Sequence, residues 1–259
     1  MSEPSDQPRH YYVRFLEDTA HLSTVELVEL IIDDPRAVYP ARPAPPEVAV
    51  CKLLIFALAD RPSCAAAARR CIEAWRAGQL GVGWMARYLG SIGHPVGAPV
   101  VRELLATGIA VAEAPNALVA IEGEGALDAL LQLMETAEDG WQRQAAAEAI
   151  GRLGSRACLP RVLAATATGV VRSSTACEAL RDVAFTEDEL IELLRGSPEL
   201  ARLGLRLLSR RAQQKPPGPL PGPAVQAAAR TAIAAGVTTL RTVTGQVQEW
   251  FDSAEPPAS

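Results

Sequence analysis

Two glycines and an arginine stand close together in GRLG, residues 151–154, and backbone amides in a glycine-rich turn can bind a phosphate group. A phosphate loop would also need a preceding strand and a longer glycine pattern, commonly followed by Lys-Ser or Lys-Thr, and this sequence has neither. We therefore interpret GRLG as a corner between two helices. In this interpretation Gly154 ends one helix, Ser155 caps the next, and Gly151 allows close packing.

Histidine and cysteine side chains are the other candidates for chemistry. The three histidines, His10, His21 and His94, are scattered, with no HExxH pattern and no pair of ligands one helical turn apart. Cys64 and Cys71 lie seven residues apart on one face of an expected helix and could form a ligand pair, but small buried thiols are the commoner use of such residues. We predict no catalytic residue, no cofactor and no metal site, and therefore no enzymatic activity.

Composition indicates the fold class and excludes some classes of function. Of the 259 residues 49% are hydrophobic and only 5% are aromatic, and alanine is abundant, which favours closely packed helices over sheets. A formal net charge of -5 argues against a nucleic-acid groove, whose affinity comes largely from Lys and Arg. The five cysteines include no CxxC pair, and neither a signal peptide nor a membrane-spanning run is evident, so we expect a reduced, cytoplasmic protein.

One pattern of apolar residues recurs four times. In residues 149–163, AIGRLGSRACLPRVL, apolar residues spaced i, i+3 end one helix, and apolar residues spaced i, i+3, i+4 follow on a second helix. A helical hairpin of about thirty residues cannot bury such stripes alone, so neighbouring units must stack. The matching positions are Leu89, Ile92, Val101, Leu104 and Leu105; Leu118, Ile121, Leu127, Leu130 and Leu131; Ile150, Leu153, Leu159, Val162 and Leu163; and Leu180, Val183, Leu190, Leu193 and Leu194.

The segment LGSRACLPRVLAA, residues 153–165, resembles the turn and second helix of a HEAT repeat, particularly the short bacterial kind related to phycobilisome-lyase repeats. Those repeats often read Leu-Gly-Asp-Pro-x-Ala-Val-Pro-x-Leu-Leu. Ser155 stands where their capping Asp does and Pro160 matches their second proline, whereas Arg156 replaces the first. The resemblance implies an all-α fold, a right-handed α-solenoid of stacked antiparallel helical hairpins. It specifies the fold far more than the activity.

Local patterns outside the repeats divide the rest of the chain. Ser23 and Glu26 form a capping box that begins a helix ending near Asp33, and further helices are expected from Pro46 to about Ala59 and over residues 63–77. The expected organisation is a disordered tail (1–9), an N-terminal helical segment with a proline-rich loop (10–46), a HEAT-like solenoid (47–213), a Pro/Gly-rich loop (214–223), C-terminal capping helices (224–253) and a second disordered tail (254–259).

The last segment, residues 237–251, has apolar residues at helical spacing but also β-branched residues, so a strand is conceivable, although the spacing and length favour a helix. We expect this helix to close the end of the repeats. A displaced helix that docks on a partner is the alternative. The four tryptophans do not recur at matching repeat positions, and we interpret most of them as packing residues.

A surface row is the remaining candidate site. If the second helices line the concave face, as in HEAT solenoids, the exposed positions carry mixed charges and small residues, which suit a protein partner better than a polyanion, although a solvated face without a role would look similar. The predicted protein-binding residues are Glu103, Gln132, Arg161, Glu192 and Arg195.

We therefore expect a noncatalytic scaffold, adaptor or inhibitor module that binds another protein and neither nucleic acid nor a membrane. The resemblance leaves two other classes open. The phycobilisome-lyase-like repeats permit a bilin or chromophore lyase-like role, and DNA-alkylation glycosylases are built from similar helical repeats. A nucleic-acid-binding protein of that kind would be expected to have a basic concave surface, with an aromatic and an acidic residue near its centre.

Overall fold

The computed structural model describes residues 16–17, 19–33, 50–214, 218–237 and 241–253. Within these ranges the regular elements are α-helices and short 3-10 helices, and no strand occurs, which confirms the all-α prediction. The two expected tails, the proline-rich loop and the start at Pro46 lie outside the described residues. The chain forms two compact units, Met1–Ala126 and Leu127–Ser259.

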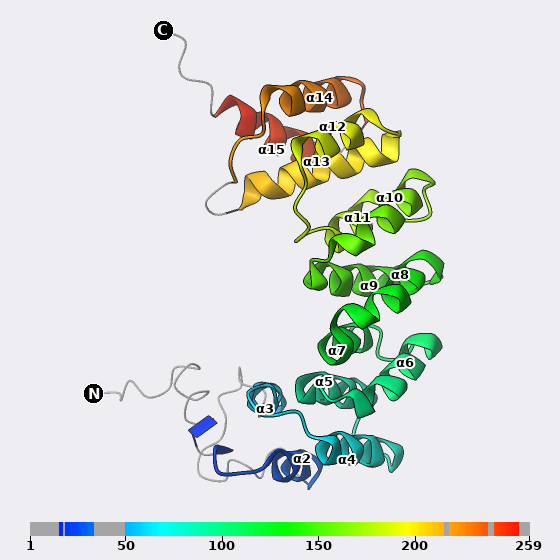
Figure 1. Ribbon diagram of the computed structural model, residues 1–259, viewed down its shortest axis with the longest axis vertical. Helices are drawn as coiled ribbons and strands as arrows, with labels where there is room; N and C mark the ends of the chain where they lie inside the picture. The colour runs from blue at the N-terminus through cyan, green and yellow to red at the C-terminus, as the bar shows by residue number, and fades with distance from the viewer. Residues whose placement is uncertain (1–15, 18, 34–49, 215–217, 238–240, 254–259) are drawn as a thin grey trace, which may run out of the picture. The chain divides into compact units, whose positions relative to one another are not determined.

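The first unit contains six described α-helices, and its capping box is the one expected from sequence. The Ser23 amide donates to Glu26 Oε2 over 2.6 Å, and the Glu26 amide donates to Ser23 Oγ over 3.2 Å. The helices are α2 (Thr24–Asp33), α3 (Val50–Ala59), α4 (Ala65–Arg76), α5 (Val82–Ile92), α6 (Ala98–Thr107) and α7 (Glu113–Glu122), with 3-10 turns η2 (Pro95–Gly97) and η3 (Gly123–Ala126) (Figure 1).

The last three helices of the second unit contribute side chains to one buried hydrophobic core. Leu205, Val225 and Phe251, which come from three different helices, are all essentially inaccessible to solvent. The helices are α8 (Leu127–Thr136), α9 (Gly140–Leu153), α10 (Leu159–Ala167), α11 (Ser173–Ala179), α12 (Glu187–Arg195), α13 (Pro198–Gln213), α14 (Pro223–Ala234) and α15 (Arg241–Asp252), with the 3-10 turn η4 (Arg156–Cys158). From Arg241 on, the last segment is thus a helix rather than a strand, and it packs against α13 and α14.

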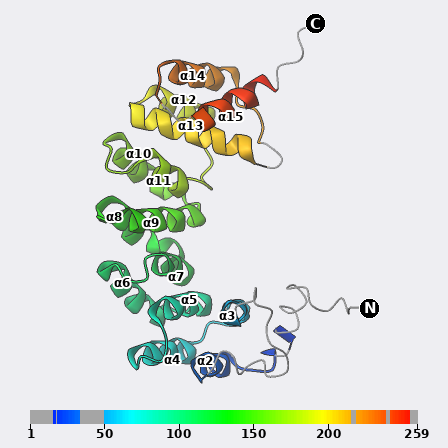
Figure 2. The ribbon, with the colours of Figure 1, turned by 180° about the vertical axis from the view of Figure 1, so that it is seen from behind.

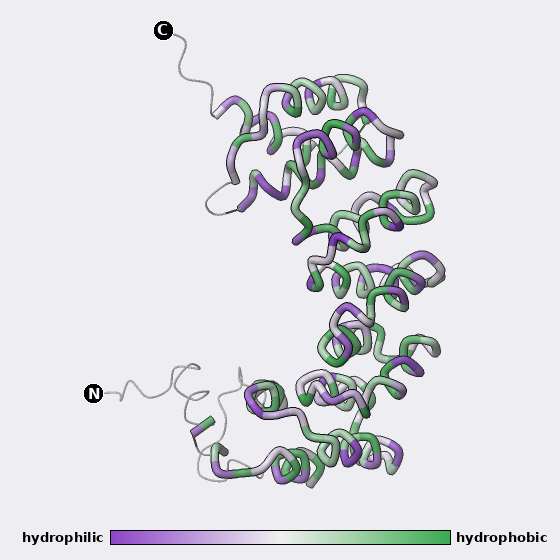
Figure 3. Tube along the Cα trace, viewed as in Figure 1, coloured by the Kyte–Doolittle hydropathy of each residue, from purple (hydrophilic) through white to green (hydrophobic). Residues whose placement is uncertain are grey.

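The repeated apolar positions form the buried stripes that the pattern predicts. All of them are buried or half-buried, and hydrophobic and hydrophilic residues alternate along the helices in both units (Figure 3). Within the second unit α9, α11 and α13 lie side by side, as Figures 1 and 2 show. One detail differs from the expectation: α11 ends at Ala179, so Leu180 and Val183 are buried in the turn that follows it.

The GRLG segment is a helix corner, as predicted. Gly154 has φ +59° and ends α9, and the hydroxyl of Ser155 accepts a hydrogen bond from the Ala157 amide over 3.4 Å. A left-handed residue at a helix end favours glycine because a Cβ there crowds the backbone. The GVG segment, residues 81–83, lies at a helix start: Gly81 caps α5, and the next two residues already belong to that helix.

Candidate functional site

The structure leaves all five predicted protein-binding residues exposed. Glu103 lies on α6 of the first unit, and the other four lie on α8, α10 and α12 of the second unit. Arg161 differs from the rest because it donates to Glu135 over 2.6 Å and approaches Asp128 at 3.5 Å, both on α8. Its positive charge is therefore largely balanced by neighbouring carboxylates.

Arg195 lies beside a shallow, mostly apolar groove of about 410 Å³ in the second unit. Alanine side chains from α13 and α14 form much of its wall, including Ala201 and Ala228. The predicted row thus contains one residue at a groove rim and one residue held in an ion-pair cluster. The structure gives these two different surroundings, which the repeat alignment alone could not distinguish.

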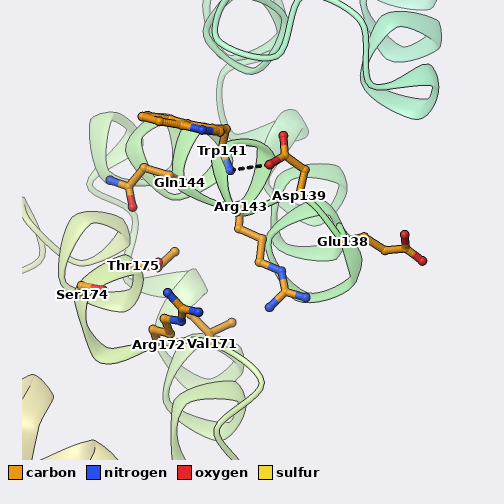
Figure 4. A pocket seen from close by; sticks show the side chains of 10 residues that line it. Glu138, Asp139, Trp141, Arg143, Gln144, Val171, Arg172, Ser174 and Thr175 are labelled. Atoms are coloured by element: carbon orange, nitrogen blue, oxygen red, sulfur yellow. Dashed lines mark hydrogen bonds between the residues drawn. The ribbon is translucent and has the colours of Figure 1, made fainter.

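A larger groove lies elsewhere in the second unit, between the turn that begins α9 and the turn that begins α11. Its volume is about 510 Å³, within the range of ligand-binding clefts. Figure 4 shows the indole of Trp141 across the groove from the side chains of the second turn. The lining residues are Glu138, Asp139, Gly140, Trp141, Arg143, Gln144, Val171, Arg172, Ser174 and Thr175.

Trp141 is the most prominent side chain of this groove, and it is the exception among the tryptophans, most of which are interpreted as packing residues. Its exposed fraction is 78%, whereas Trp75 and Trp84 are half-buried and Trp250 is buried. Asp139 fixes the start of the helix that carries it, because its Oδ1 accepts a hydrogen bond from the Trp141 amide over 3.1 Å. The indole is thus presented to solvent at a well-defined helix start.

A sequence signal for this exposure existed. Residues three, seven and eleven positions after Trp141 lie on the same side of an α-helix, and they are Gln144, Glu148 and Arg152. All three are polar, so the tryptophan falls on the polar face of α9 rather than on the stripe that contains Ile150. The helical register of Trp141 thus indicates an exposed side chain, although tryptophan as a residue type favours packing.

Two arginines line the groove, and neither has a carboxylate partner among the described residues. Arg143 donates from Nε to the Ala137 carbonyl oxygen and from Nη1 to the Val170 carbonyl oxygen, the latter over 3.1 Å. These bonds tie the two turns together and hold the guanidinium in place. The side chain of Arg172 is exposed and makes no hydrogen bond or ion pair within the described residues.

The groove also contains two acidic residues, so it is not uniformly basic. Asp139 is engaged at the start of α9, while Glu138 points away from the other lining side chains (Figure 4). The hydroxyls of Ser174 and Thr175 and the amide of Gln144 complete the polar lining. Such a set can form hydrogen bonds and ion pairs with a bound chain, and it offers an aromatic face for apolar contact.

Buried cysteines offer little nucleophilic reactivity in this structure. Burial raises the pKa of the Cys71 thiol to about 12 and that of Cys158 to about 11, and it also raises the pKa of Cys177. Cys71 is a buried thiol, as the interpretation has it, whereas Cys64 is half-buried and caps the start of α4. Among the described residues no cluster of three His, Cys, Asp or Glu side chains could hold a metal ion.

Comparison with models of protein families, with curated proteins and with solved structures found no match. None of the helices in the described ranges combines the length and apolar character needed to cross a membrane. The residues of the chain itself are therefore the basis for a functional assignment.

Proposed function

We propose that this chain is a noncatalytic protein-binding module of the cytoplasm that acts as a scaffold, adaptor or inhibitor. Each unit would be a run of HEAT-like helical hairpins of the kind that builds a right-handed α-solenoid. The recurring apolar stripes and the side-by-side packing of α9, α11 and α13 support this proposal. Helical repeats of this kind present broad surfaces to partners without requiring catalytic groups.

The observation that carries the proposal is the exposure of Trp141 beside the groove. A tryptophan that is 78% exposed leaves most of a large apolar ring in water, and that ring contributes nothing to the buried core of its own chain. Trp and Arg are the residue types most enriched among the energetically dominant positions of protein interfaces. Here both types line one groove, through Trp141, Arg143 and Arg172.

Affinity capture of the full-length tagged protein from its native cells, with quantitative mass spectrometry, tests this function. We expect a stoichiometric protein whose recovery falls at least about tenfold with Trp141→Ala, because truncating an interface tryptophan commonly costs more than 1–2 kcal/mol of binding. Ile109→Ala, which truncates another exposed apolar side chain, is the matched control and should retain the partner. Equal recovery of every protein by wild type and Trp141→Ala would contradict a protein-binding role for this groove.

The exposed row predicted from the repeats provides a separate arm of the same experiment. Charge reversal at Glu103, Arg161 and Glu192 changes that row without altering the groove residues. Loss of the partner in this variant, together with retention in Trp141→Ala, would move the binding surface to the second helices. Loss in both variants would indicate that one partner covers both surfaces.

A further inference from the structure

We propose that the groove beside Trp141 binds an extended acidic segment of the partner protein, with an apolar side chain on the indole and a carboxylate on Arg172 and Arg143. This inference rests on the proposed function and specifies the chemistry of the partner. The groove takes its residues from two turns that are separated by some thirty positions in the sequence.

The charge of the partner follows from the arginines. Elsewhere in the second unit Arg161 and Arg210 are paired with carboxylates of the same chain, at 2.6 Å and 3.2 Å. Within the described residues Arg172 has no such partner, and the hydrogen bonds of Arg143 go to two carbonyl oxygens, which carry no net charge. A carboxylate from another chain can pair with a guanidinium through two parallel hydrogen bonds, a geometry that lysine cannot reproduce.

The position of Arg143 suits this task because it is fixed before any ligand arrives. Its Nε and Nη1 groups are held by the carbonyls of Ala137 and Val170, while Nη2 forms no hydrogen bond with the described residues. A guanidinium that is already ordered loses less conformational entropy on binding than a free one does. Arg172, which is exposed and has no partner in the described part of the chain, would bind the same carboxylate or a neighbouring one.

The apolar part of the partner follows from two exposed side chains. Trp141 lines the groove, and Val170, which is 45% exposed, directly precedes the lining residue Val171. Both belong to the turns that Arg143 links. A segment that carries one apolar side chain between acidic residues can bury that side chain on the indole while its carboxylates reach the guanidinium groups.

The acidic residues of the groove favour single carboxylates over a polyphosphate. Asp139 lies in the lining with its Oδ1 bonded to the Trp141 amide, so its negative charge stays close to the indole. With Glu138 it brings the formal charge of the lining to zero, although within the described residues neither carboxylate forms an ion pair with Arg143 or Arg172. A nucleic acid brings closely spaced phosphates and depends on a surplus of positive charge, which this lining does not supply.

The hydroxyls of Ser174 and Thr175 suit an extended backbone. Both belong to the first turn of α11 and line the groove beside Arg172. Neither side chain forms a hydrogen bond within the described residues, so each is available to a peptide amide or carbonyl. The volume of about 510 Å³ accommodates a few residues of an extended chain.

Fluorescently labelled decapeptides, measured by polarisation with the full-length protein, test the proposal. Three pools carry a fixed central Leu or Phe flanked by Glu and Asp, by Gln and Asn, or by Lys. We expect the acidic pool to bind at least about tenfold more tightly than the other two, and to weaken as salt screens the charges. Trp141→Ala and Arg172→Glu should each reduce its affinity at least about tenfold.

Arg152→Glu is the matched control for the charge reversal. Arg152 is also exposed on α9 and has no ion-pair partner among the residues that the structure describes, but it lies outside the groove lining. The acidic pool should therefore bind this variant as it binds wild type, apart from a weak long-range effect of charge. Equal binding of the three pools, binding of the acidic pool that ignores Trp141→Ala and Arg172→Glu, or no binding of any pool would overturn the proposal. Preferential binding of a labelled single-stranded oligonucleotide, lost with Arg172→Glu, would also overturn it.

The two proposals fail in different ways. If the cellular partner depends on Trp141 but the peptide pools do not distinguish acidic from neutral residues, the protein-binding function stands and the acidic segment does not. If the acidic peptides bind as expected but no cellular protein depends on Trp141, the groove has the proposed chemistry and the scaffold function is wrong.

Discussion

Gly151 of α9 faces the backbone carbonyl oxygen of Glu178 on α11 so closely that a Cβ at position 151 would overlap that oxygen. Gly90 has the same relationship in the first unit, where a Cβ would lie 3.0 Å from the Cα of Ala117. The two pairs have the same separation in sequence, and the two glycines occupy matching repeat positions. A missing side chain thus sets how closely α5 approaches α7 in the first unit and how closely α9 approaches α11 in the second.

Gly151→Ala should therefore destabilise the chain, although alanine favours helix more than glycine does. The new methyl group can be accommodated only if α9 and α11 move apart, and we expect a loss of at least about 2 kcal/mol in the free energy of unfolding. Gly140→Ala in the same helix is the control: a Cβ there meets nothing within 4 Å, so stability should hold or rise by up to about 1 kcal/mol. Urea titration monitored by circular dichroism measures both, and similar stabilities for the two variants would contradict the close approach.

Gly154→Ala tests the helix corner. The new Cβ would meet Asp182 only at ordinary contact distances, 3.6 Å from its Cβ, so the cost should be the left-handed backbone strain of about 1–2 kcal/mol. Gly154→Asn should reduce the free energy of unfolding less than Gly154→Ala does, since asparagine tolerates this backbone conformation better than alanine. Inorganic phosphate should leave the melting temperature of the wild type unchanged. A phosphate-dependent rise in melting temperature that disappears with Gly154→Ala would restore the phosphate-loop interpretation.

The start of α12 provides a test of a capping box. The hydroxyl of Thr186 accepts from the Glu189 amide over 3.2 Å, and the Thr186 amide donates to the Glu189 carboxylate over 2.8 Å. Thr186→Ala removes the first of these bonds and should cost about 1 kcal/mol of unfolding free energy. Thr136→Ala, an exposed position at the end of α8 whose hydroxyl bonds only within its own helix, should change stability by less than about 0.5 kcal/mol in the same denaturant titration.

Cys71 should make the chain less stable at alkaline pH. Burial raises its pKa from an ordinary value of 9.0 to about 12, so the folded chain keeps a proton that the unfolded chain releases. The resulting stabilisation is complete below about pH 9 and is lost as pH rises towards about 12, with a slope of at most about 1.4 kcal/mol per pH unit.

Melting temperatures measured between pH 8 and 11 for wild type and Cys71→Ala check this dependence, and the variant should show a shallower decline. Ile72→Val is the control, because it trims a neighbouring buried residue that does not titrate. Ile72→Val should lower the melting temperature at every pH without changing the slope of melting temperature against pH. Identical slopes for wild type and Cys71→Ala would contradict a buried, protonated thiol at this position.

Trp141 should dominate the part of the fluorescence that acrylamide quenches readily. Its indole is far more exposed than those of Trp75, Trp84 and Trp250, so a small neutral quencher reaches it first. Trp141→Phe should remove this component and change the unfolding free energy by less than about 0.5 kcal/mol, because the ring makes little contact with its own chain. An unchanged quenching curve in the variant would show that the indole is covered.

The sequence by itself determined the features that depend on neighbours within a few residues. The capping pair of Ser23 with Glu26 and the left-handed Gly154 require only local backbone geometry. The helical content and the buried stripes follow from the spacing of apolar residues in the same way. These features could therefore be read from single segments of the chain.

The tertiary structure alone decided where separate segments meet. The repeat pattern identified Gly151 as a place of close packing, but it could not show that the neighbour is the carbonyl of Glu178. It also could not place Arg172 across a groove from Trp141, because the two belong to different turns brought together by the packing of α9 against α11. Periodicity determines which face of a helix is buried, whereas the shape of neighbouring side chains and turns determines which exposed residues share a surface.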